Sequence, residues 1–274
     1  MMAHMPELPE VETIARQLAP LLVGRRVRDL TVLDPRLRTA PALRLAGRKI
    51  EAVSRSGKRV LVRFSGARAG KDPLWLTVHL RMTGRLIWLD AGSRLDRAHL
   101  RARMRLDRGA LAFYDTRRFG TFEWFRSAEA ARPDGIDPLS AELTPVRLRA
   151  LFGTSRQGIK PWLLRQDRLV GLGNIYASEI LHAARIAPGR EVRTLDEDES
   201  SRLCRAMRAI LRRAIRACGT TFSDFQDSHG EIGSYQRFLA VYDREGEPCP
   251  RCRRPVVREV QQQRSTFWCQ GCQR

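Results

Sequence analysis

The stretch that says most about the fold is LRARMRL, at residues 100–106. Its apolar residues and its arginines alternate strictly, which is the period of a β-strand with one buried and one exposed face. Asp107-Arg108-Gly109 is typical of a tight turn, and residues 110–114 return as a second strand. The sequence therefore predicts an antiparallel β-hairpin here.

Further short strands are expected on both sides of this hairpin. They are predicted at residues 27–33, 60–64, 75–80 and 122–125. Ahead of them, apolar residues recur at helical spacing and predict an amphipathic helix over residues 9–23 that ends at Gly24. Several antiparallel strands with one packed helix indicate a β-sandwich in the first half of the chain.

The second half of the chain has the pattern of a helical domain. Turn-forming residues at 127–140 predict a linker. Helices are expected from Thr144-Pro145, from Lys160-Pro161, from Asn174 through Ala184, and over residues 196–218. Residues 220–235 have no clear period and are interpreted as a mobile loop. The fold class predicted from this pattern is α+β, with two domains.

The chain is strongly basic. It carries 50 Lys and Arg against 30 Asp and Glu, a formal net charge of +20, and only four of the cations are lysines. Such an excess suggests a polyanionic partner, most commonly nucleic acid, although charge alone identifies no reaction. With no signal peptide and no apolar run of the roughly 18–20 residues that a membrane span needs, a cytoplasmic location is expected.

Four of the six cysteines form a pattern typical of a metal site. Two residues separate Cys249 from Cys252 and Cys269 from Cys272, and sixteen residues lie between the pairs. Two such pairs close a tetrahedron of thiolates around one ion, so we predict a single structural Zn²⁺. The arginines of the same segment would hold phosphates. The separate Cys204 and Cys218 are expected to be small apolar core residues.

The heptad PELPEVE, residues 6–12, admits two interpretations. Proline and acidic residues are an ordinary way to enter a helix. If Pro6 is instead the first residue of the mature protein, its secondary amine is partly neutral at physiological pH and can attack an electrophilic sugar carbon. Glu7 would then donate a proton and Glu10 would shape the pocket. The preceding Met1–Met5 would block this amine if they were retained.

Three other motifs contain candidate residues for nucleic-acid binding. GLGNIY at residues 171–176 does not fit a dinucleotide-binding motif, because Tyr176 stands where that motif has its third glycine. It is interpreted either as the start of a helix that binds phosphate with the help of Asn174, or as a plain helical hairpin. YDTRRFG at 114–120 and HLRMTG at 79–84 supply an arginine, a phenylalanine and a methionine that suit insertion into DNA, although taken singly Phe119 and Met82 also suit a core. Lys58 is interpreted as a point charge, a proton donor or a solvated strand residue.

These motifs occur in the same order in one known family. PELPEVE, Gly57-Lys58, RRFG at 117–120, GLGNIYASE at 171–179 and the terminal four-cysteine finger together resemble the formamidopyrimidine-DNA glycosylase branch of the Fpg/Nei family. The resemblance runs from about residue 5 to the end. It implies a bifunctional DNA glycosylase and abasic-site lyase that removes 8-oxoguanine and formamidopyrimidines. The opening Pro-Glu-Leu-Pro resembles the purine-directed branch.

The resemblance also implies residue roles. Pro6 would be the nucleophile, Glu7 the proton donor in base release, Lys58 the proton donor in β-elimination, and Arg264 a phosphate ligand that assists the δ-step. DNA contacts are implied for Met82, His99, Arg117, Phe119, Lys160 and Asn174. The zinc ligands would be Cys249, Cys252, Cys269 and Cys272.

The same resemblance sets expectations for domains and partners. It implies a catalytic β-sandwich over residues 6–126, a linker over 127–140, a helix–two-turns–helix domain with a lesion-capping loop over 141–235, and a zinc finger over 236–274. The partner would be double-stranded DNA with oxidised bases or abasic sites, bound by a bacterial, nucleoid-associated monomer. Two alternatives stay open: a binding protein without catalysis if Pro6 is blocked, and specificity for oxidised pyrimidines as in Nei.

Overall fold

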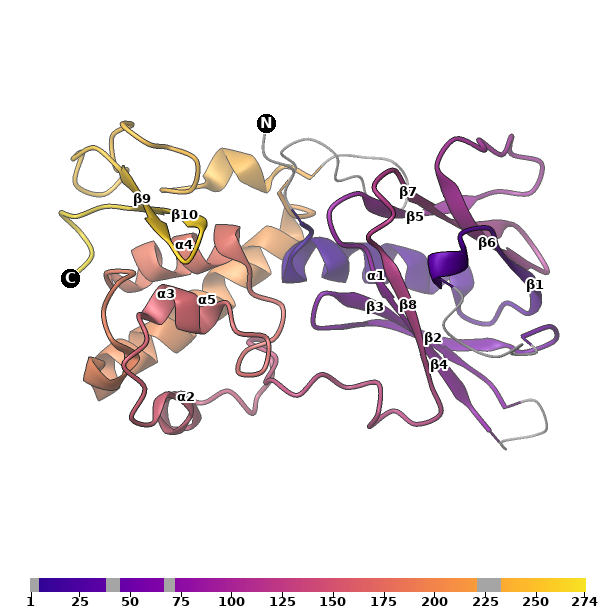
Figure 1. The fold of residues 1–274 in the computed structure, drawn as a ribbon, viewed down its shortest axis with the longest axis horizontal. Helices are drawn as coiled ribbons and strands as arrows, with labels where there is room; N and C mark the ends of the chain where they lie inside the picture. Colours follow the sequence, from indigo (N-terminus) through magenta and orange to yellow (C-terminus); the bar gives the residue numbers. More distant parts are fainter. Residues whose placement is uncertain (1–4, 38–44, 67–71, 221–232) are drawn as a thin grey trace. The chain divides into compact units, whose positions relative to one another are not determined.

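The computed structural model describes residues 5–37, 45–66, 72–220 and 233–274 (Figure 1). The chain divides into two compact units. The first contains Met1–Arg132 together with Ala217–Gln236, and the second contains Pro133–Arg216 together with Arg237–Arg274. The predicted domain boundaries remain a prediction, and the units below are described one at a time.

The first unit is a β-sandwich with one helix, as predicted. Helix α1 spans Leu8–Leu22. One sheet has the antiparallel order β1-β6-β7-β5 and the other the order β2-β3-β4-β8. The strands are β1 (Val27–Val32), β2 (Ile50–Ser56), β3 (Arg59–Phe64), β4 (Leu74–His79), β5 (Gly84–Leu89), β6 (Leu100–Leu106), β7 (Ala110–Asp115) and β8 (Thr121–Phe125), with a short 3-10 helix η1 at Pro35–Leu37. Strands β2 and β5 were not predicted.

The sandwich forms because each strand contributes apolar side chains to one shared core. In β6 the apolar residues are buried and the arginines between them lie half-buried or exposed, as the alternation predicts. Met104 from one sheet and Val62 from the other belong to the same apolar cluster, which also includes Ile14 and Leu18 of α1. Burial of apolar surface on one face of each element therefore places α1, and Pro6 ahead of it, against the sandwich.

The second unit is helical and carries a small β-hairpin. Its elements are α2 (Pro145–Phe152), α3 (Ile159–Leu163), α4 (Asn174–Ala184), η2 (Val192–Thr194), α5 (Glu197–Arg216), β9 (Val257–Gln261) and β10 (Arg264–Trp268), and η3 spans Tyr235–Phe238. The four predicted helices are confirmed, although α5 ends two residues before the predicted end. Cys204 is buried as expected, but the expectation for Cys218 is wrong: it is exposed and has a left-handed backbone beyond α5.

Helix α4 holds the finger segment through side chains along its length. The carboxylate of Glu179 is 1% exposed and accepts hydrogen bonds from the backbone N–H groups of Ala240, Val241 and Tyr242 at 2.8–2.9 Å. One turn later, Nε2 of His182 lies 3.4 Å from Sγ of Cys249. Because these partners are Cys249 itself and three residues in the segment that leads to it, α4 anchors the start of the finger.

Within the part of the chain that the structure describes, no helix is both long and apolar enough to cross a bilayer.

Candidate functional site

The amino-terminal candidate residues are buried at the start of α1. Pro6 is buried and Glu7 is 3% exposed. Glu10 is 2% exposed; its Oε2 accepts from the backbone N–H of Glu7 at 2.9 Å and its Oε1 accepts from that of Thr220 at 2.7 Å. A single carboxylate therefore joins the backbone of the predicted proton donor to that of Thr220, the first residue of the predicted loop.

Gly219 shows how tightly this junction is packed. Its φ is +81°, and a Cβ added there would lie 2.7 Å from Oε1 of Glu10. Only glycine combines that left-handed backbone with such a close approach. Of the residues predicted as a mobile loop, 220–235, residues 221–232 lie outside the described residues.

Lys58 lies in the two-residue turn between β2 and β3. Ser56 pairs with Arg59 across this turn, and Gly57 has a φ of +60°, as the first central residue of a type II′ turn requires. Lys58 is only 9% exposed, so it is not a solvated strand residue. Nε of Arg55, just before the turn, bonds Oε2 of Glu12 on α1 at 2.9 Å. This ion pair ties the hairpin that carries Lys58 to the helix behind Pro6.

His79, at the end of β4, is a polar group for which no separate role was predicted. Its Nδ1 accepts the backbone N–H of Arg81 at 3.0 Å. Burial, followed by the nearby charges of Arg81, Arg59 and Lys58, lowers the pKa of His79 to about 3. The ring is therefore neutral near pH 7, and because Nδ1 is an acceptor, Nε2 carries the proton.

The structure brings together the three residues predicted to insert into DNA. Nη1 of Arg117 lies 3.4 Å from Sδ of Met82, and the guanidinium carbon of Arg117 lies 4.8 Å from the centroid of the Phe119 ring. Met82 is half-buried, but Phe119 is 47% exposed and is not a core residue. His99 is exposed as well, with a left-handed φ of +60°. A cation and two apolar side chains thus form one accessible cluster.

Arg118, between the two inserting residues of the 116–120 turn, faces a different partner. Its Nε and Nη2 bond both oxygens of Asp34 at 2.7 Å in a bidentate pair. The hydrogen bond from Arg118 is the largest cause that lowers the pKa of Asp34 to about 2. The pair joins the turn to the segment after β1, 84 residues earlier in the chain.

This ion pair should make stability depend on pH at acidic values. Because the folded pKa of Asp34 is below its ordinary value of 3.8, the stabilisation is present above about pH 5 and is lost as pH falls through about 2. We expect the difference in unfolding free energy between the parent chain and D34N to be constant from about pH 7 to 5 and to shrink below about pH 4. Urea unfolding at a series of pH values measures it. A difference that stays constant down to about pH 2 would contradict the assignment.

In the second unit, two of the predicted DNA-binding residues meet the predicted phosphate ligand Arg264 at the β9–β10 hairpin. Nζ of Lys160, in α3, is buried and donates to the carbonyl oxygen of Ser265 and to Oγ1 of Thr266, both at 2.8 Å. Nδ2 of Asn174, the first residue of α4, donates to the same carbonyl at 2.9 Å. Arg264, next to Ser265, is exposed. Lys160 and Asn174 therefore hold the strand that begins with Arg264.

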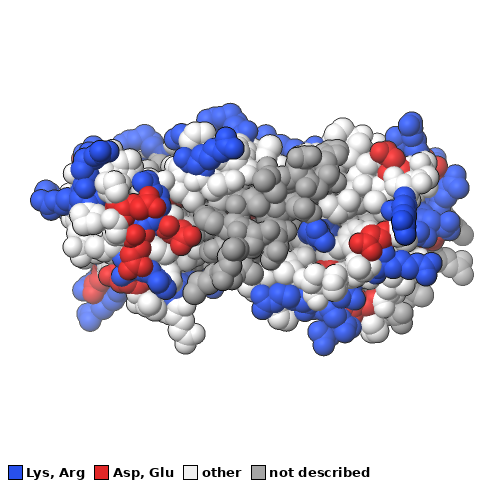
Figure 2. All heavy atoms as spheres, turned by 90° about the horizontal axis from the view of Figure 1, so that it is seen from above, with Lys and Arg blue, Asp and Glu red and all other residues white. Residues whose placement is uncertain are grey.

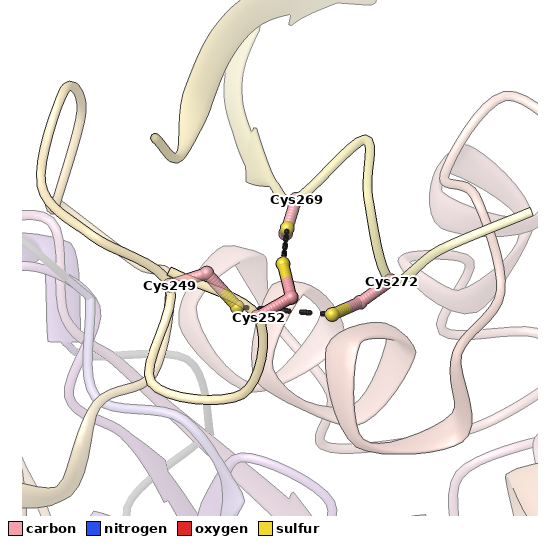
Figure 3. A group of neighbouring side chains, drawn as sticks. All are labelled: Cys249, Cys252, Cys269 and Cys272. Carbon is pink, nitrogen blue, oxygen red and sulfur yellow. Dashed lines mark hydrogen bonds between the residues drawn. The ribbon is translucent and has the colours of Figure 1, made fainter. Parts of the chain in front are cut away.

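The four predicted zinc ligands lie close together (Figure 3). Their sulfur atoms all lie within 4.8 Å of one another, with Cys252 and Cys269 at 3.4 Å and Cys249 and Cys272 at 3.9 Å. Thiolates bound to one Zn²⁺ at about 2.3 Å are separated by roughly 3.8 Å, which these distances fit. All four tetrahedral positions are filled by protein, so the centre holds one structural Zn²⁺ and leaves no position for substrate.

Basic side chains are distributed over the face of the molecule seen in Figure 2. Figure 2 shows Lys and Arg spread over the face in view, with fewer Asp and Glu between them. The distribution agrees with the net charge of +20 and with binding of a polyanion.

Family models match almost the whole chain. A model of the formamidopyrimidine-DNA glycosylase N-terminal domain matches residues 5–122, a model of the H2TH domain of the same enzymes matches residues 135–226, and a model of the zinc finger found in FPG and IleRS matches residues 246–274.

Individual relatives agree over the full length. The formamidopyrimidine-DNA glycosylase of Pelotomaculum thermopropionicum is 40% identical over 98% of this chain and 99% of its own length. The crystal structure of the MutM (Fpg) protein of Thermus thermophilus is similar with a TM-score of 0.86 and 38% identity, covering 98% of both chains. Lactococcus lactis Fpg in complex with DNA containing an abasic site has a TM-score of 0.86 and 31% identity, covering 97% of this chain and 99% of its own.

Proposed function

The chain belongs to the formamidopyrimidine-DNA glycosylase family, and from this premise we propose how its own residues perform base excision. It is a DNA glycosylase of base excision repair and an abasic-site lyase, and it binds DNA. The family match leaves the identity of the reacting residues to be argued from the site.

We propose that Pro6 is the nucleophile. With Met5 removed, its secondary amine attacks C1′ of the damaged nucleotide, the bond from C1′ to the base breaks, and the base leaves with a proton from Glu7. The amine proton passes to O4′ as the C1′–O4′ bond breaks, which opens the sugar and leaves an iminium between Pro6 and C1′. Solvent water takes the C2′ proton, and the 3′-phosphate leaves in β-elimination with a proton from Lys58. Loss of the C4′ proton then expels the 5′-phosphate in the δ-step, which Arg264 assists. The burial of Pro6 and Glu7 next to Glu10 supports these roles.

The cluster of Met82, Arg117 and Phe119 is the observation that carries the proposal. A glycosylase must take the damaged base out of the stack, and side chains that occupy the space it leaves stabilise the opened duplex. The Arg117 guanidinium, which contacts both Met82 and the exposed ring of Phe119, and these two apolar side chains have the chemistry for that task. His99 and Asn174 are proposed to contact the DNA backbone around the lesion, and the buried Lys160 to hold the hairpin that carries Arg264.

The proposed substrates are oxidised purines, 8-oxoguanine and formamidopyrimidines. A second candidate is an oxidised pyrimidine, since the Lactococcus lactis Fpg, 31% identical, is known in complex with DNA that contains one. Matched duplexes that differ only in the lesion separate the two. We expect kcat/KM to favour 8-oxoguanine over 5-hydroxycytosine by about 10-fold or more, the order of discrimination that differences in pocket fit provide. A higher kcat/KM for 5-hydroxycytosine would contradict the assignment to oxidised purines and support oxidised pyrimidines as the substrates.

The remaining proposals concern the state of the protein. We propose that it acts as a monomer in the cytoplasm, associated with the nucleoid. If Met5 is retained, Pro6 is an amide without a lone pair to donate, and the chain would bind lesions or abasic sites without excising the base.

A further inference from the structure

Asp115, the last residue of β7, makes hydrogen bonds to both loops that carry the inserting residues. The loop at 80–84 carries Met82, and the loop at 116–120 carries Arg117 and Phe119. Oδ1 of Asp115 accepts from the hydroxyl of Thr83 and, at 3.2 Å, from the backbone N–H of Arg117. Oδ2 accepts from the backbone N–H of Gly120 at 2.7 Å. The carboxylate is 1% exposed, so these contacts replace water.

Thr83 completes the connection between the two loops. Its hydroxyl donates to Asp115 and accepts from the backbone N–H of Arg117 at 3.2 Å, and the residue is 9% exposed. A hydroxyl is needed here because the group must both donate and accept. The residue directly before Thr83 is Met82, so this one side chain links the methionine loop to the arginine loop.

At one end of each loop the backbone packs too closely against its neighbours to admit a side chain. A Cβ on Gly84 would lie 2.4 Å from the carbonyl oxygen of Leu80, and one on Gly120 would lie 2.5 Å from Cζ of Phe113. Each loop therefore ends at a glycine that packs closely against a neighbouring group. The hydrogen bonds of Asp115 set the position of the two loops relative to each other.

A third segment is attached to the same residue through its backbone. The N–H of Asp115 donates to the carbonyl oxygen of His99 at 3.0 Å, and its own carbonyl oxygen accepts from Nε of Arg101 at 2.8 Å. Asp115 thus contacts all three segments of the first unit that contain predicted DNA-binding residues.

We propose that Asp115 and Thr83 are positioning residues that hold Met82, Arg117, Phe119 and His99 in register for opening the duplex. The inference rests on the proposed function, because it concerns how the inserting residues are held. Neither Asp115 nor Thr83 touches the DNA in this proposal. Misplacement of an inserting group by about an ångström lowers the rate steeply, even when the reacting groups are intact.

The test compares T83V with T83S. Valine keeps the shape of threonine and removes the hydroxyl, whereas serine keeps the hydroxyl. Each variant is assayed on a duplex with 8-oxoguanine paired to cytosine and on a single strand with a preformed abasic site. We expect T83V to lose about 10-fold or more in kcat/KM on the duplex, the effect of leaving a buried polar group unpaired, while T83S stays within about 2-fold. On the single strand, where there is no pair to open, both should match the parent chain.

A spectroscopic readout follows the opening directly. With 2-aminopurine beside the lesion, unstacking raises fluorescence, and T83V should show a smaller rise than T83S at saturating protein. D115N is the second variant. Both carboxylate oxygens of Asp115 accept hydrogen bonds, whereas an amide has only one oxygen to accept them. D115N should therefore lose activity on the duplex and keep it on the single strand, as T83V does. Thermal unfolding of each variant identifies any that fails to fold, in which case T83A replaces it.

The outcomes separate this inference from the proposed function. If T83V and T83S are equally active on the duplex, or if T83V is equally impaired on the single strand, the positioning role is overturned. If the parent chain itself gives no rise in fluorescence and F119A excises the lesion normally, the insertion role of the cluster is overturned instead.

Discussion

A chain that begins at Pro6 will form a covalent adduct with abasic-site DNA when borohydride is added, and a chain that retains Met5 will not. Borohydride reduces an iminium to a stable amine, and only a free amine forms that iminium. Loss of the nucleophile should lower strand cleavage by at least about 10³-fold, as removal of a catalytic nucleophile does in other enzymes. Gel electrophoresis measures the adduct, and mass spectrometry of the amino-terminal peptide locates it.

Glu7→Gln is the matched control for this experiment. It keeps the amine of Pro6 but removes the group proposed to protonate the departing base. On a preformed abasic site there is no base to release, so the adduct should persist, whereas excision of 8-oxoguanine should be lost. An adduct of full yield from protein in which every molecule still carries Met5 would refute the assignment of Pro6.

The second large effect is expected from the metal centre. C249S removes one of the four thiolates, so the remaining three ligands bind Zn²⁺ far more weakly. Because metal binding supplies the folding free energy of such a finger, the finger then loses its fold. We expect loss of Zn²⁺ and loss of order in the β9–β10 hairpin. Binding to abasic-site duplex should be about 100-fold weaker, because Arg264 and the other arginines of the finger are no longer held in position to bind phosphates.

C218S controls for the loss of a cysteine as such. Cys218 is exposed and lies outside the four-cysteine group, so its substitution should leave the zinc content unchanged. Metal analysis, amide exchange over residues 257–268 and fluorescence anisotropy with labelled duplex give the three readouts. Equal DNA affinity of C249S and C218S would show that the finger is not needed for binding.

The sequence predicted the elements whose periodicity is strong. The alternation over residues 100–106 and the apolar stripe of α1 were decisive because each has one buried face. Strand β5, GRLIWL at 84–89, was missed because it begins with glycine and has consecutive apolar residues, and β2 was missed because four of its seven residues are polar. Cys218 was misassigned because the exposure of a helix end depends on tertiary packing.

Site residues could be predicted from the sequence where their role depends on the residue type and its spacing. Contacts between residues far apart in the sequence could not be predicted. The four cysteines carry their ligand geometry in their spacing. The contacts of Asp115 with Thr83, 32 residues apart, and of Asp34 with Arg118, 84 apart, have no local signal. Nor did spacing indicate that the ammonium of Lys160 bonds the hairpin 105 residues later.

The cap that Glu179 provides has a consequence for how this finger can be exchanged between proteins. A related zinc finger occurs in IleRS, so the module is found in more than one architecture. Here the three N–H groups just ahead of it are satisfied by a carboxylate from helix α4. If the segment from residue 237 onward were grafted onto another protein without α4, these N–H groups would lose their acceptor. Val241 and Tyr242 are buried, so water would not replace it. A chimaera therefore needs α4 together with the finger, or another carboxylate in the same place.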